Sequence, residues 1–581
     1  MTEPRPLAAD TEVIRIGNCS GFYGDRFSAM REMLTGGDLD VLTGDYLAEL
    51  TMLILGRDKL KDPDRGYAKT FLRQMRACLA LALERRVRIV VNAGGLNPAG
   101  LAQRLRELAT ELGVEAEIAH VEGDDLTARA GELGLGQPLT ANAYLGAWGI
   151  VECLGADADV VVTGRVTDAS LAVGPAAAHF GWSREDHDRL AGAVVAGHVI
   201  ECGAQATGGN YSFFGEIDDL VHPGFPIAEI RRDGTAVITK HAGTGGAVTV
   251  DTVTAQLVYE IQGARYAGPD VTARLDTIEL DQDGADRVRI SGTRGEPPPP
   301  TLKVGLNAVG GHRNEMSFVL TGLDIEAKAA LAREQLEAHL TRRPAELTWS
   351  LVRLDQPDAA SQEQASAILR CVVRDSDPDV VGRAFSGIAV ELALASYPGF
   401  SLTSVPGNAS PYGEFSSGYV DVDRVPHIAV LPDGGRADIA PSARTQQLRE
   451  VPEPDLPAPP VDGPSRREPL GAVAAARSGD KGGDANIGVW VRTDEQWRWL
   501  VRALTADRVR EMLPETAEMP ITRTVLPNLR AVNFVVESVL GRGAAYRARF
   551  DPQAKGLGEW LRSRLIDVPE TVVDTTCEEL R

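Results

Sequence analysis

The chain has little cysteine, and none of it is arranged as a redox or zinc motif. Six cysteines are spread over 581 residues, and no two of them form a CxxC pair. This spacing excludes a zinc ribbon and a thioredoxin-type site. So few thiols in so long a chain also exclude the disulfide framework of a small secreted domain.

Long apolar runs are missing as well. No stretch reaches the roughly 18 consecutive apolar residues that a membrane-spanning helix needs. The first residues, MTEPRP, lack the basic and then apolar order of a signal peptide. We therefore expect a soluble, cytoplasmic protein with no membrane partner.

The short motifs of common cofactor sites are absent too. No Gly-Lys dipeptide occurs, which excludes a phosphate-binding P-loop. The first glycine-rich loop has its glycines at positions 17, 21 and 24, which is not the GxGxxG spacing of a dinucleotide site. Neither HExxH nor GxSxG is present. Because these motifs are absent, the sequence predicts no cofactor with certainty and assigns no residue to a metal.

Positive charge is in short supply. The chain holds 60 Lys and Arg against 82 Asp and Glu, a net charge of −22. Such an excess repels nucleic-acid backbones and anionic lipid surfaces, so neither is an expected partner. A small anionic ligand is still compatible, because one or two local cations and backbone N–H groups decide that contact.

The composition that remains is that of a globular protein, with 43% hydrophobic and 24% charged residues. Up to about residue 215, short β-branched runs alternate with amphipathic helices. One such helix follows Asn97 and is expected to bury one face that carries Leu101, Leu105, Leu108 and Leu112. The alternation predicts an α/β fold with a mostly parallel, doubly wound sheet.

Later segments change character. Residues 216–449 are typical of an α+β half, with a strand expected over 247–253 and a helix over 325–340. Residues 450–468 are rich in proline, which lacks a backbone N–H, and predict a linker. The expected domains are a large N-terminal one over 1–449, with halves of about 1–215 and 216–449, and a small α+β one over 469–581.

Glycine and polar side chains follow each early strand. Loops after parallel strands lie along one edge of the sheet, where ligands bind. Turn-forming glycines and helix-capping Asp or Asn explain any one loop equally well. Five such loops together favour one ligand cleft, and they come after the runs ending at Ile16, Leu42, Val91, Val121 and Val162.

Three carboxylates of these loops, Asp25, Asp45 and Asp168, are the predicted catalytic acid–base groups. Carboxylates crowded into one cleft raise one another's pKa and share protons near neutrality; solvated helix caps are the alternative. The same loops supply the predicted substrate-binding residues Asn18, Ser20, Gly21, Arg26, Asn92, Gly94, Gly95, Asn97, Asp124 and Arg165.

Two later glycine-rich segments, 239–246 and 477–486, place a cation beside a turn. Successive N–H groups in such turns bind phosphate or carboxylate, although tight turns alone explain them as well. The second segment is expected to connect two strands. These segments add the substrate-binding predictions Lys240, His241, Thr244, Ser478, Asp480, Lys481, Asp484 and Asn486.

Other reactive side chains favour structural interpretations. His198, Glu201 and Cys202 are possible metal ligands, yet they fall on a helix expected to begin near Ser183, where a structural histidine and a buried thiol are the better interpretation. Cys19 precedes a helix start, which lowers a thiol pKa, but no base lies near it in the sequence. We therefore interpret Cys19 as a buried structural thiol.

Several long segments resemble the acyclic terpene utilisation family. The likeness runs from about Val13 to Pro569 with no departure inside the matching segments. Asn210, at the end of one of them, is included as a substrate-binding residue. The matching segments are 16–25 (IGNCSGFYGD), 42–50 (LTGDYLAEL), 92–98 (NAGGLNP), 161–170 (VVTGRVTDAS), 197–210 (GHVIECGAQATGGN), 295–300 (GEPPPP) and 476–486 (ARSGDKGGDAN).

The resemblance implies a large N-terminal domain and a smaller C-terminal domain with a ferredoxin-like fold. The family takes its name from bacterial gene clusters that degrade citronellol- and geraniol-type terpenoids through acyl-CoA intermediates. Those clusters also encode a biotin-dependent geranyl-CoA carboxylase and a hydratase. The resemblance implies catabolism of branched acyl-CoA thioesters, with the CoA moiety as part of the substrate.

Three functions stay open. The first is acid–base chemistry on an acyl-CoA thioester, as in a hydratase, lyase or isomerase, with Lys240 or Lys481 meeting the CoA phosphates. The second is a non-catalytic accessory or assembly protein, for example for a biotin-dependent carboxylase. The third is metal-assisted hydrolysis using the carboxylates and His198. A homo-oligomer is expected, because closed symmetric assemblies are common among such proteins.

Overall fold

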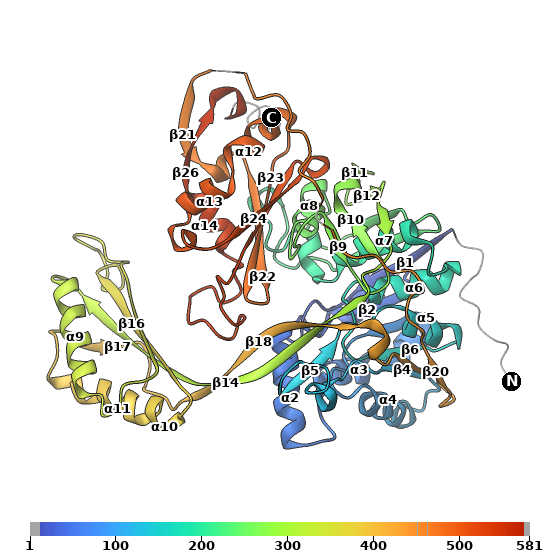
Figure 1. Cartoon of the computed structure of the whole chain (residues 1–581), viewed down its shortest axis with the longest axis horizontal. Helices are drawn as coiled ribbons and strands as arrows, with labels where there is room; N and C mark the ends of the chain where they lie inside the picture. Colours follow the sequence, from blue (N-terminus) through green and yellow to red (C-terminus); the bar gives the residue numbers. More distant parts are fainter. Residues whose placement is uncertain (1–11, 450, 462, 574–581) are drawn as a thin grey trace. The chain divides into compact units, whose positions relative to one another are not determined.

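The structure is a computed structural model that describes residues 12–449, 451–461 and 463–573 (Figure 1). Cys577 lies outside the described residues. The chain divides into two compact units. The first holds the chain up to residue 307, residues 415–544 and the chain from 551 onward; the second holds 308–414 with 545–550. The strands β14 (Thr301–Thr321) and β18 (Ser410–Asp421) belong partly to each unit.

A large mixed sheet forms the first unit's framework. Its parallel part confirms the predicted α/β class, but antiparallel strands extend both edges, so the sheet is mixed rather than mostly parallel. The parallel strands are, in spatial order, β1 (Val13–Asn18), β2 (Val41–Gly44), β3 (Arg88–Val91), β6 (Val160–Thr163) and β4 (Ile118–Glu122). Beyond β1 lie β7 (Pro226–Arg231), β8 (Ala236–Lys240), β12 (Val288–Ser291) and β11 (Glu279–Gln282); beyond β4 lie β19 (Ile428–Val430) and β20 (Arg436–Asp438).

Helices cover both faces of this sheet. Successive side chains of a strand point to opposite faces, and those of β3 enter different cores: Val90 joins one core cluster, whereas Ile89 and Val91 join another. Buried side chains of α1 (Ala29–Gly36), α3 (Lys69–Arg85) and α4 (Pro98–Leu112) share the cluster of Ile89; those of α5 (Trp148–Gly155), α6 (Ser170–Phe180) and α7 (His187–Ile200) share that of Val90.

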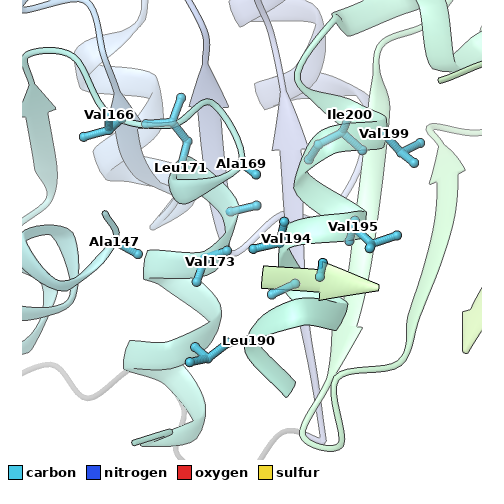
Figure 2. Close-up of a cluster of buried hydrophobic side chains, with 14 of the residues drawn as sticks. Ala147, Val166, Ala169, Leu171, Val173, Leu190, Val194, Val195, Val199 and Ile200 are labelled. Carbon is cyan, nitrogen blue, oxygen red and sulfur yellow. The ribbon is translucent and has the colours of Figure 1, made fainter. Parts of the chain in front are cut away.

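The core around α6 and α7 reaches the end of the sheet where the loops lie. Leu171 and Val173 of α6 and Val194 and Ile200 of α7 are buried in one cluster (Figure 2). Leu171 and Ile200 also line a cavity with Asn18 of β1. The packing of these two helices therefore fixes the floor of the loop region.

The predicted helix after Asn97 is confirmed. The Asn97 Oδ1 accepts a hydrogen bond from the Gly100 N–H at 2.9 Å, and Pro98 occupies the first turn. The helix ends at Gly113, whose φ of 68° is left-handed. Leu101, Leu105 and Leu108 are buried, as the spacing predicts. Leu112, predicted on the same face, is exposed at the end of the helix.

The strand expected over 247–253 is wrong, because those residues begin α8 (Val250–Leu257). Thr249 and Thr252 form a capping box, in which each side chain accepts from the backbone N–H of the other residue. A run of β-branched residues suggested a strand, but the paired caps set a helix start. The expected helix over 325–340 is confirmed as α9 (Ile325–His339).

Four short strands in the N-terminal part of the first unit lie outside the large mixed sheet. The strand β5 pairs with β14, and β13, β10 and β9 form a small sheet. The helix α2 (Glu49–Lys61) belongs to the same part, and the bounds of the strands are β5 (Thr140–Ala143), β9 (Arg265–Ala267), β10 (Thr272–Arg274) and β13 (Arg294–Glu296).

The second unit is an antiparallel sheet in the order β15-β16-β14-β17 with helices packed in one core. Residues 545–550 of the C-terminal part complete it. Arg374 of β16 lies over the Tyr546 ring at 4.2 Å and donates to the Tyr546 carbonyl at 2.8 Å, and Arg313 donates to the Ala545 carbonyl at 3.1 Å. The elements are β15 (Glu346–Val352), β16 (Ser366–Asp375), β17 (Ser401–Leu402), α10 (Pro378–Val381) and α11 (Arg383–Glu391).

The C-terminal part of the first unit has its own core and an antiparallel sheet. Residues 451–461 contain no helix or strand. The turn expected within 477–486 is short, since only Gly482 and Gly483 separate β22 from β23. The elements are β21 (Ser465–Pro469), β22 (Ala475–Lys481), β23 (Asp484–Trp490), α12 (Asp494–Ala503), α13 (Ala506–Met512), β24 (Ile521–Leu526), β25 (Ala531–Val536), α14 (Leu557–Ser563) and β26 (Leu565–Pro569).

Across the described part of the chain, no helix combines the length and apolarity needed to span a bilayer.

The packing of α4 predicts a contrast within one helix. Leu105 is fully buried, whereas Leu112 on the same helix is 37% exposed. Leu105→Ala should lower the free energy of unfolding by about 2–5 kcal/mol, because it removes buried methyl groups and leaves a cavity. Leu112→Ala should lower it by less than about 1 kcal/mol. Urea unfolding followed by circular dichroism measures both, and equal losses would contradict the difference in burial between the two leucines.

Candidate functional site

The loops after the parallel strands are joined by buried hydrogen bonds at one end of the sheet. The Asn92 Nδ2, after β3, donates to the Asp45 Oδ1, after β2, at 2.6 Å. The Asn92 Oδ1 accepts from the Tyr46 N–H at 2.7 Å. Both side chains of the pair are buried, Asn92 completely. The predicted approach of these two loops is thus present in the structure.

Arg165, in the loop after β6, links two further loops. Its guanidinium donates to the Leu47 carbonyl and, at 2.6 Å, to the Asp168 Oδ1. Its backbone N–H donates to the Asp124 Oδ2, after β4, at 2.9 Å. Because Arg165 is only 4% exposed, its charge is balanced inside the protein and not by solvent.

The loop after β1 is bound to the end of α7. The Asn18 Nδ2 donates to the carbonyls of Ile200 and Glu201 at 2.6 and 2.8 Å. Gly21 lies so close to the residue after Glu201 that a Cβ there would sit 2.7 Å from the Cys202 carbonyl carbon. These contacts bring Glu201 to the loop cluster from a helix about 180 residues further along the chain.

A small cavity lies where these loops and helices meet. Its volume is about 10 Å³, which is roughly the space of one water molecule. Three carboxylate residues line it, and apolar side chains of α6 and α7 form its floor. The lining residues are Asn18, Thr43, Asp45, Asp168, Leu171, Ala172, Gly197, Ile200 and Glu201.

Burial and repulsion by neighbouring charges raise the pKa values of Asp45 and Glu201 in the cavity. The pKa of Asp45 is raised well above its ordinary value by burial and by the charge of Asp168, against the opposing effect of Arg165. The pKa of Glu201 is likewise raised by burial and by Asp168 and Glu260. Like charges in one enclosed space favour a shared proton over full ionisation. The cavity therefore favours the protonated form of Asp45 and Glu201 more than water does.

A second layer of charge surrounds the cavity, part of it from the C-terminal part of the unit. Burial and the charges of Glu260 and Glu49 raise the pKa of Asp480 to about 8. The pKa of Glu49 is raised by burial, although Lys303 and Lys481 oppose the rise. Asp480 and Lys481, both predicted site residues, thus act on the same cluster as the loops of the sheet.

Two cations of this layer, Arg165 and Lys303, lie over the ring of Tyr144. The guanidinium carbon of Arg165 lies 4.2 Å from the centre of the Tyr144 ring, and the Lys303 Nζ lies 4.9 Å from it. Burial raises the pKa of Tyr144 to about 12. Lys303 also pairs with Glu49 at 3.7 Å, and both of these side chains are partly exposed. This side of the cluster is therefore its connection to solvent.

Several buried polar atoms near the cluster have no hydrogen-bond partner in the protein. Within the described residues, these include the Glu49 Oε2, the Glu201 Oε2 and the His198 Nε2, as well as both amide atoms of Gln256. Native proteins leave few such atoms unpaired, and those that remain often mark a functional role or bound water. The arrangement is suited to receiving a small polar group.

His198 is a positioning group for Glu201 in this arrangement. The His198 Nδ1 lies 3.1 Å from the Glu201 Oε1, and the imidazole is 2% exposed. Burial and the nearby Lys481 lower the pKa of His198 to about 4, so the ring is neutral. Among the residues with assigned positions, no group of three or more His, Cys, Asp or Glu is arranged to hold a metal ion.

Asp25 and its neighbour Arg26 lie outside the cavity lining. The two oxygens of Asp25 accept from the backbone N–H groups of Gly21 and Arg26 at 2.8 and 2.7 Å, which stabilises the loop itself. Arg26 pairs with Glu32 at 2.8 Å. Cys19 is fully buried, and burial raises its thiol pKa, which favours the unreactive thiol form.

Other predicted ligands of the early loops stabilise backbone turns. The Ser20 Oγ donates to the Phe22 carbonyl at 3.0 Å. The Gly94 N–H donates to the Thr163 carbonyl at 3.0 Å, which joins the loops after β3 and β6. Gly95 has a left-handed φ of 53°, and Asn97 caps α4. Asn210 is exposed at a left-handed φ of 58°.

The segment 239–246 is closed by its own contacts. The Lys240 Nζ donates to the Thr244 carbonyl at 2.7 Å and pairs with Asp286 at 3.0 Å. The Thr244 Oγ1 donates to the His241 carbonyl, and the His241 Nε2 contacts the Met33 carbonyl at 3.0 Å. The cation predicted to meet an anion here is therefore already paired inside the protein.

In the segment 477–486, only part of the prediction maps onto the cluster. Ser478 accepts from the Gly558 N–H at 2.8 Å, and Asp484 accepts from the Ser538 N–H at 2.8 Å, so both stabilise the C-terminal domain. Asn486 contacts the turn at 258–260 and not a cavity. Asp480 and Lys481 remain, as the electrostatic partners of Glu49 and Glu201.

Several residues of the cluster escaped sequence-based reasoning. Glu201 was interpreted as part of a helix, and Glu49, Glu260 and Lys303 follow no motif with a known role. Glu260 has a left-handed φ of 55°, which is unusual for a residue other than glycine and is visible only in the structure. Tyr144 and Tyr266 likewise required the fold to bring them near the carboxylates.

Comparison with known proteins agrees with the resemblance of the sequence segments. Residues 14–431 match the family described as acyclic terpene utilisation family protein AtuA. Residues 468–567 match the AtuA ferredoxin-like domain, which gives the fold of the C-terminal domain. None of the curated proteins compared with the chain matches it.

Asp124 predicts a pH dependence of stability. Burial raises the pKa of this carboxyl from 3.8 to about 7, so the folded protein binds the proton more tightly than the unfolded chain. Its contribution to stability is complete below pH 3.8 and is lost as the pH rises towards 7. Asp124→Asn should therefore reduce the fall in unfolding free energy between pH 5 and 7 by up to about 2.5 kcal/mol.

The exposed neighbour Asp125 provides the matched control, since Asp125→Asn should leave most of the fall in place. Urea unfolding at pH 5, 6 and 7 measures the three proteins. An unchanged pH dependence in Asp124→Asn would show that this carboxyl is already ionised in the folded state.

Proposed function

The chain belongs to the acyclic terpene utilisation family, and from this premise we propose that it is an enzyme that transfers protons on a branched acyl-CoA thioester. Family membership implies a role in acyclic terpene utilisation. The observation that carries the finer proposal is the cavity shared by Asp45, Asp168 and Glu201, in which burial and mutual repulsion raise carboxyl pKa values.

General acid–base catalysis works best with groups whose pKa lies near the working pH. In the proposed reaction, an ionised carboxylate of the cavity removes a proton from the carbon next to the thioester carbonyl. A neighbouring protonated carboxyl then gives a proton to another carbon or to a departing hydroxyl group. One proton is taken and one is returned, which corresponds to an isomerase, hydratase or lyase.

Negative charge develops on the thioester oxygen when the proton is removed. Asn92 is committed to Asp45 and Tyr46, so we assign the stabilisation of this oxygen to the cations near the cavity and not to an asparagine amide. Lys481 acts on both Glu49 and Glu201 electrostatically, and Lys303 lies on the partly exposed side. Preorganised cations in a site with little water stabilise such charge strongly.

The size of the cavity limits what part of the substrate enters it. About 10 Å³ is enough for a water-sized group and not for an acyl chain. The reacting carbon atoms are therefore expected at the rim, beside Glu201 and Asp168, with the longer parts of the thioester extending towards Lys303 and Glu49. A water molecule in the cavity would supply the hydroxyl group of a hydration.

Loss of the cavity carboxylates should abolish turnover without unfolding the protein. Glu201→Gln and Asp168→Asn are each expected to lower kcat/KM by about 10²-fold or more, because each removes a proton-transfer group. The assay incubates a panel of straight and branched acyl-CoA thioesters in D₂O and follows product masses and deuterium incorporation. Wild-type protein should introduce deuterium into at least one branched thioester.

Asp270→Asn is the matched control, because Asp270 is another buried carboxyl whose pKa burial raises, to about 6, yet it binds the Ala147 N–H at 2.7 Å away from the cavity. Its kcat/KM should stay within about twofold of wild type. No exchange and no turnover by wild-type protein with any thioester would contradict the enzyme proposal. Capture of a biotin-containing partner by such an inactive protein would favour the accessory function.

A further inference from the structure

Glu260 occupies a backbone conformation that its side chain disfavours. Its φ of 55° lies in the left-handed region, which residues other than glycine rarely adopt. The residue follows Val258, which caps α8, and Tyr259. Strained conformations of this kind persist only where surrounding contacts impose them, and they are concentrated at functional sites.

Two buried asparagines of the C-terminal domain impose this conformation. The Asn486 Oδ1 accepts from the Glu260 N–H at 2.7 Å, and the Asn486 Nδ2 donates to the Val258 carbonyl at 2.9 Å. The same Nδ2 donates to the Asn533 Oδ1, and the Asn533 Nδ2 donates to the Ile261 carbonyl at 3.3 Å. Both asparagines are completely buried. The turn is thus held on both sides of Glu260.

The sheet of the C-terminal domain approaches this turn closely enough to require glycine. A Cβ on Gly488 would lie 2.5 Å from side-chain atoms of Val258, and one on Gly479 would lie 2.4 Å from the Tyr259 ring. Real Cβ contacts are not this short, so a side chain at Gly488 would shift the turn, and one at Gly479 would displace the Tyr259 ring. The two strands β22 and β23 therefore serve as a template for residues 258–261.

The charge of Glu260 reaches the carboxylates of the candidate site. It raises the pKa of Glu201 and of Asp480, and it opposes the lowering of the pKa of His198. Glu260 is partly exposed, and it is not among the residues that line the cavity. A change in its position would alter the protonation of groups on both the N-terminal and the C-terminal parts of the cluster.

We propose that Asn486 is a positioning residue of the site, which fixes Glu260 in its left-handed conformation so that the Glu260 carboxylate faces the proton-transfer cluster. The ferredoxin-like domain is then an integral part of the site, because it supplies Asp480 and Lys481 directly and Glu260 through Asn486. The effect on turnover rests on the proposed function, whereas the effect on the turn does not.

The first experiment needs no substrate. Hydrogen–deuterium exchange of the full chain, read by mass spectrometry, compares wild type with Asn486→Ala and Asn528→Ala. Asn528 is the matched control, since its Nδ2 joins the same domain to the carbonyls of Leu275 and Ile278, each at 2.9 Å, away from Glu260. The peptide containing Val258–Ile261 should exchange at least tenfold faster in Asn486→Ala and at the wild-type rate in Asn528→Ala.

Asn486→Asp serves as the second variant if Asn486→Ala does not fold. It keeps an acceptor for the Glu260 N–H and loses the donor to Val258, so a smaller increase in exchange of the same peptide is expected. Unchanged exchange of that peptide in the folded Asn486 variant would overturn the proposal, whatever reaction the protein catalyses.

The second experiment tests the link to turnover with a double-mutant cycle. Glu260→Gln and Asn486→Ala should each lower kcat/KM by at least tenfold, and the double variant should be no slower than the slower single variant, because both changes remove the same positioned carboxylate. Both variants should also shift the pH profile of kcat/KM in the same direction. If the losses of kcat/KM in the two single variants multiply in the double variant, the two residues act independently and the positioning role of Asn486 is overturned. The same conclusion follows if Asn528→Ala lowers kcat/KM as much as Asn486→Ala does.

The two arms separate the two failures. If wild-type protein turns over no thioester, the proposed function fails while faster exchange in Asn486→Ala still supports the control of Glu260 by Asn486. If turnover is present and the exchange pattern is unchanged, the proposed function stands and the positioning role of Asn486 is wrong.

Discussion

The structure depends on keeping acidic side chains away from water without enough cations to neutralise them. Asp45 and Glu201 are buried in one small cavity beside Asp168, and Arg165 is the cation bound among them. Burying an unpaired charge is costly, so burial raises the pKa of Asp45 and of Glu201 and favours their protonated forms. The mixed sheet, the caps at its loop ends and the packing of α6 against α7 all serve to hold this arrangement in place.

The same constraint explains why separate parts of the chain meet here. Buried carboxyls need donors, and the loops of the sheet supply only part of them. Lys303 comes from the start of β14, and Lys481 comes from the hairpin of the ferredoxin-like domain. The C-terminal domain also contacts the turn after α8 through fully buried asparagines. The C-terminal domain is thus packed against the residues of the candidate site and contributes side chains next to them.

Much of the parallel sheet and its loop cluster could be predicted because the signals are local. Asn97 and Pro98 predict the start of a helix. The loops after β2, β3 and β6 come directly after their strands, so the sequence predicts that Asp45, Asn92 and Asp168 lie at one edge of the sheet. Sequence reasoning failed where distant contacts decide. The sequence predicts a structural helix at Glu201, and only the contacts of Asn18 with residues 200–201 bring it to the cavity. The strand predicted over 247–253 is wrong for a local reason, the capping box of Thr249 and Thr252. The sequence predicts that Lys240 can bind an anionic ligand, but in the fold its ammonium group is paired with Asp286.

The second unit is closed by residues from far along the chain, and this has a consequence for biosynthesis. Its sheet is formed from residues between 308 and 414, yet Arg313 and Arg374 bind the backbone of residues 545–546. A ribosome must add more than a hundred further residues before the segment 545–550 is available. The unit therefore cannot mature as it emerges during translation, and its last packing step is expected to wait until the chain is nearly finished.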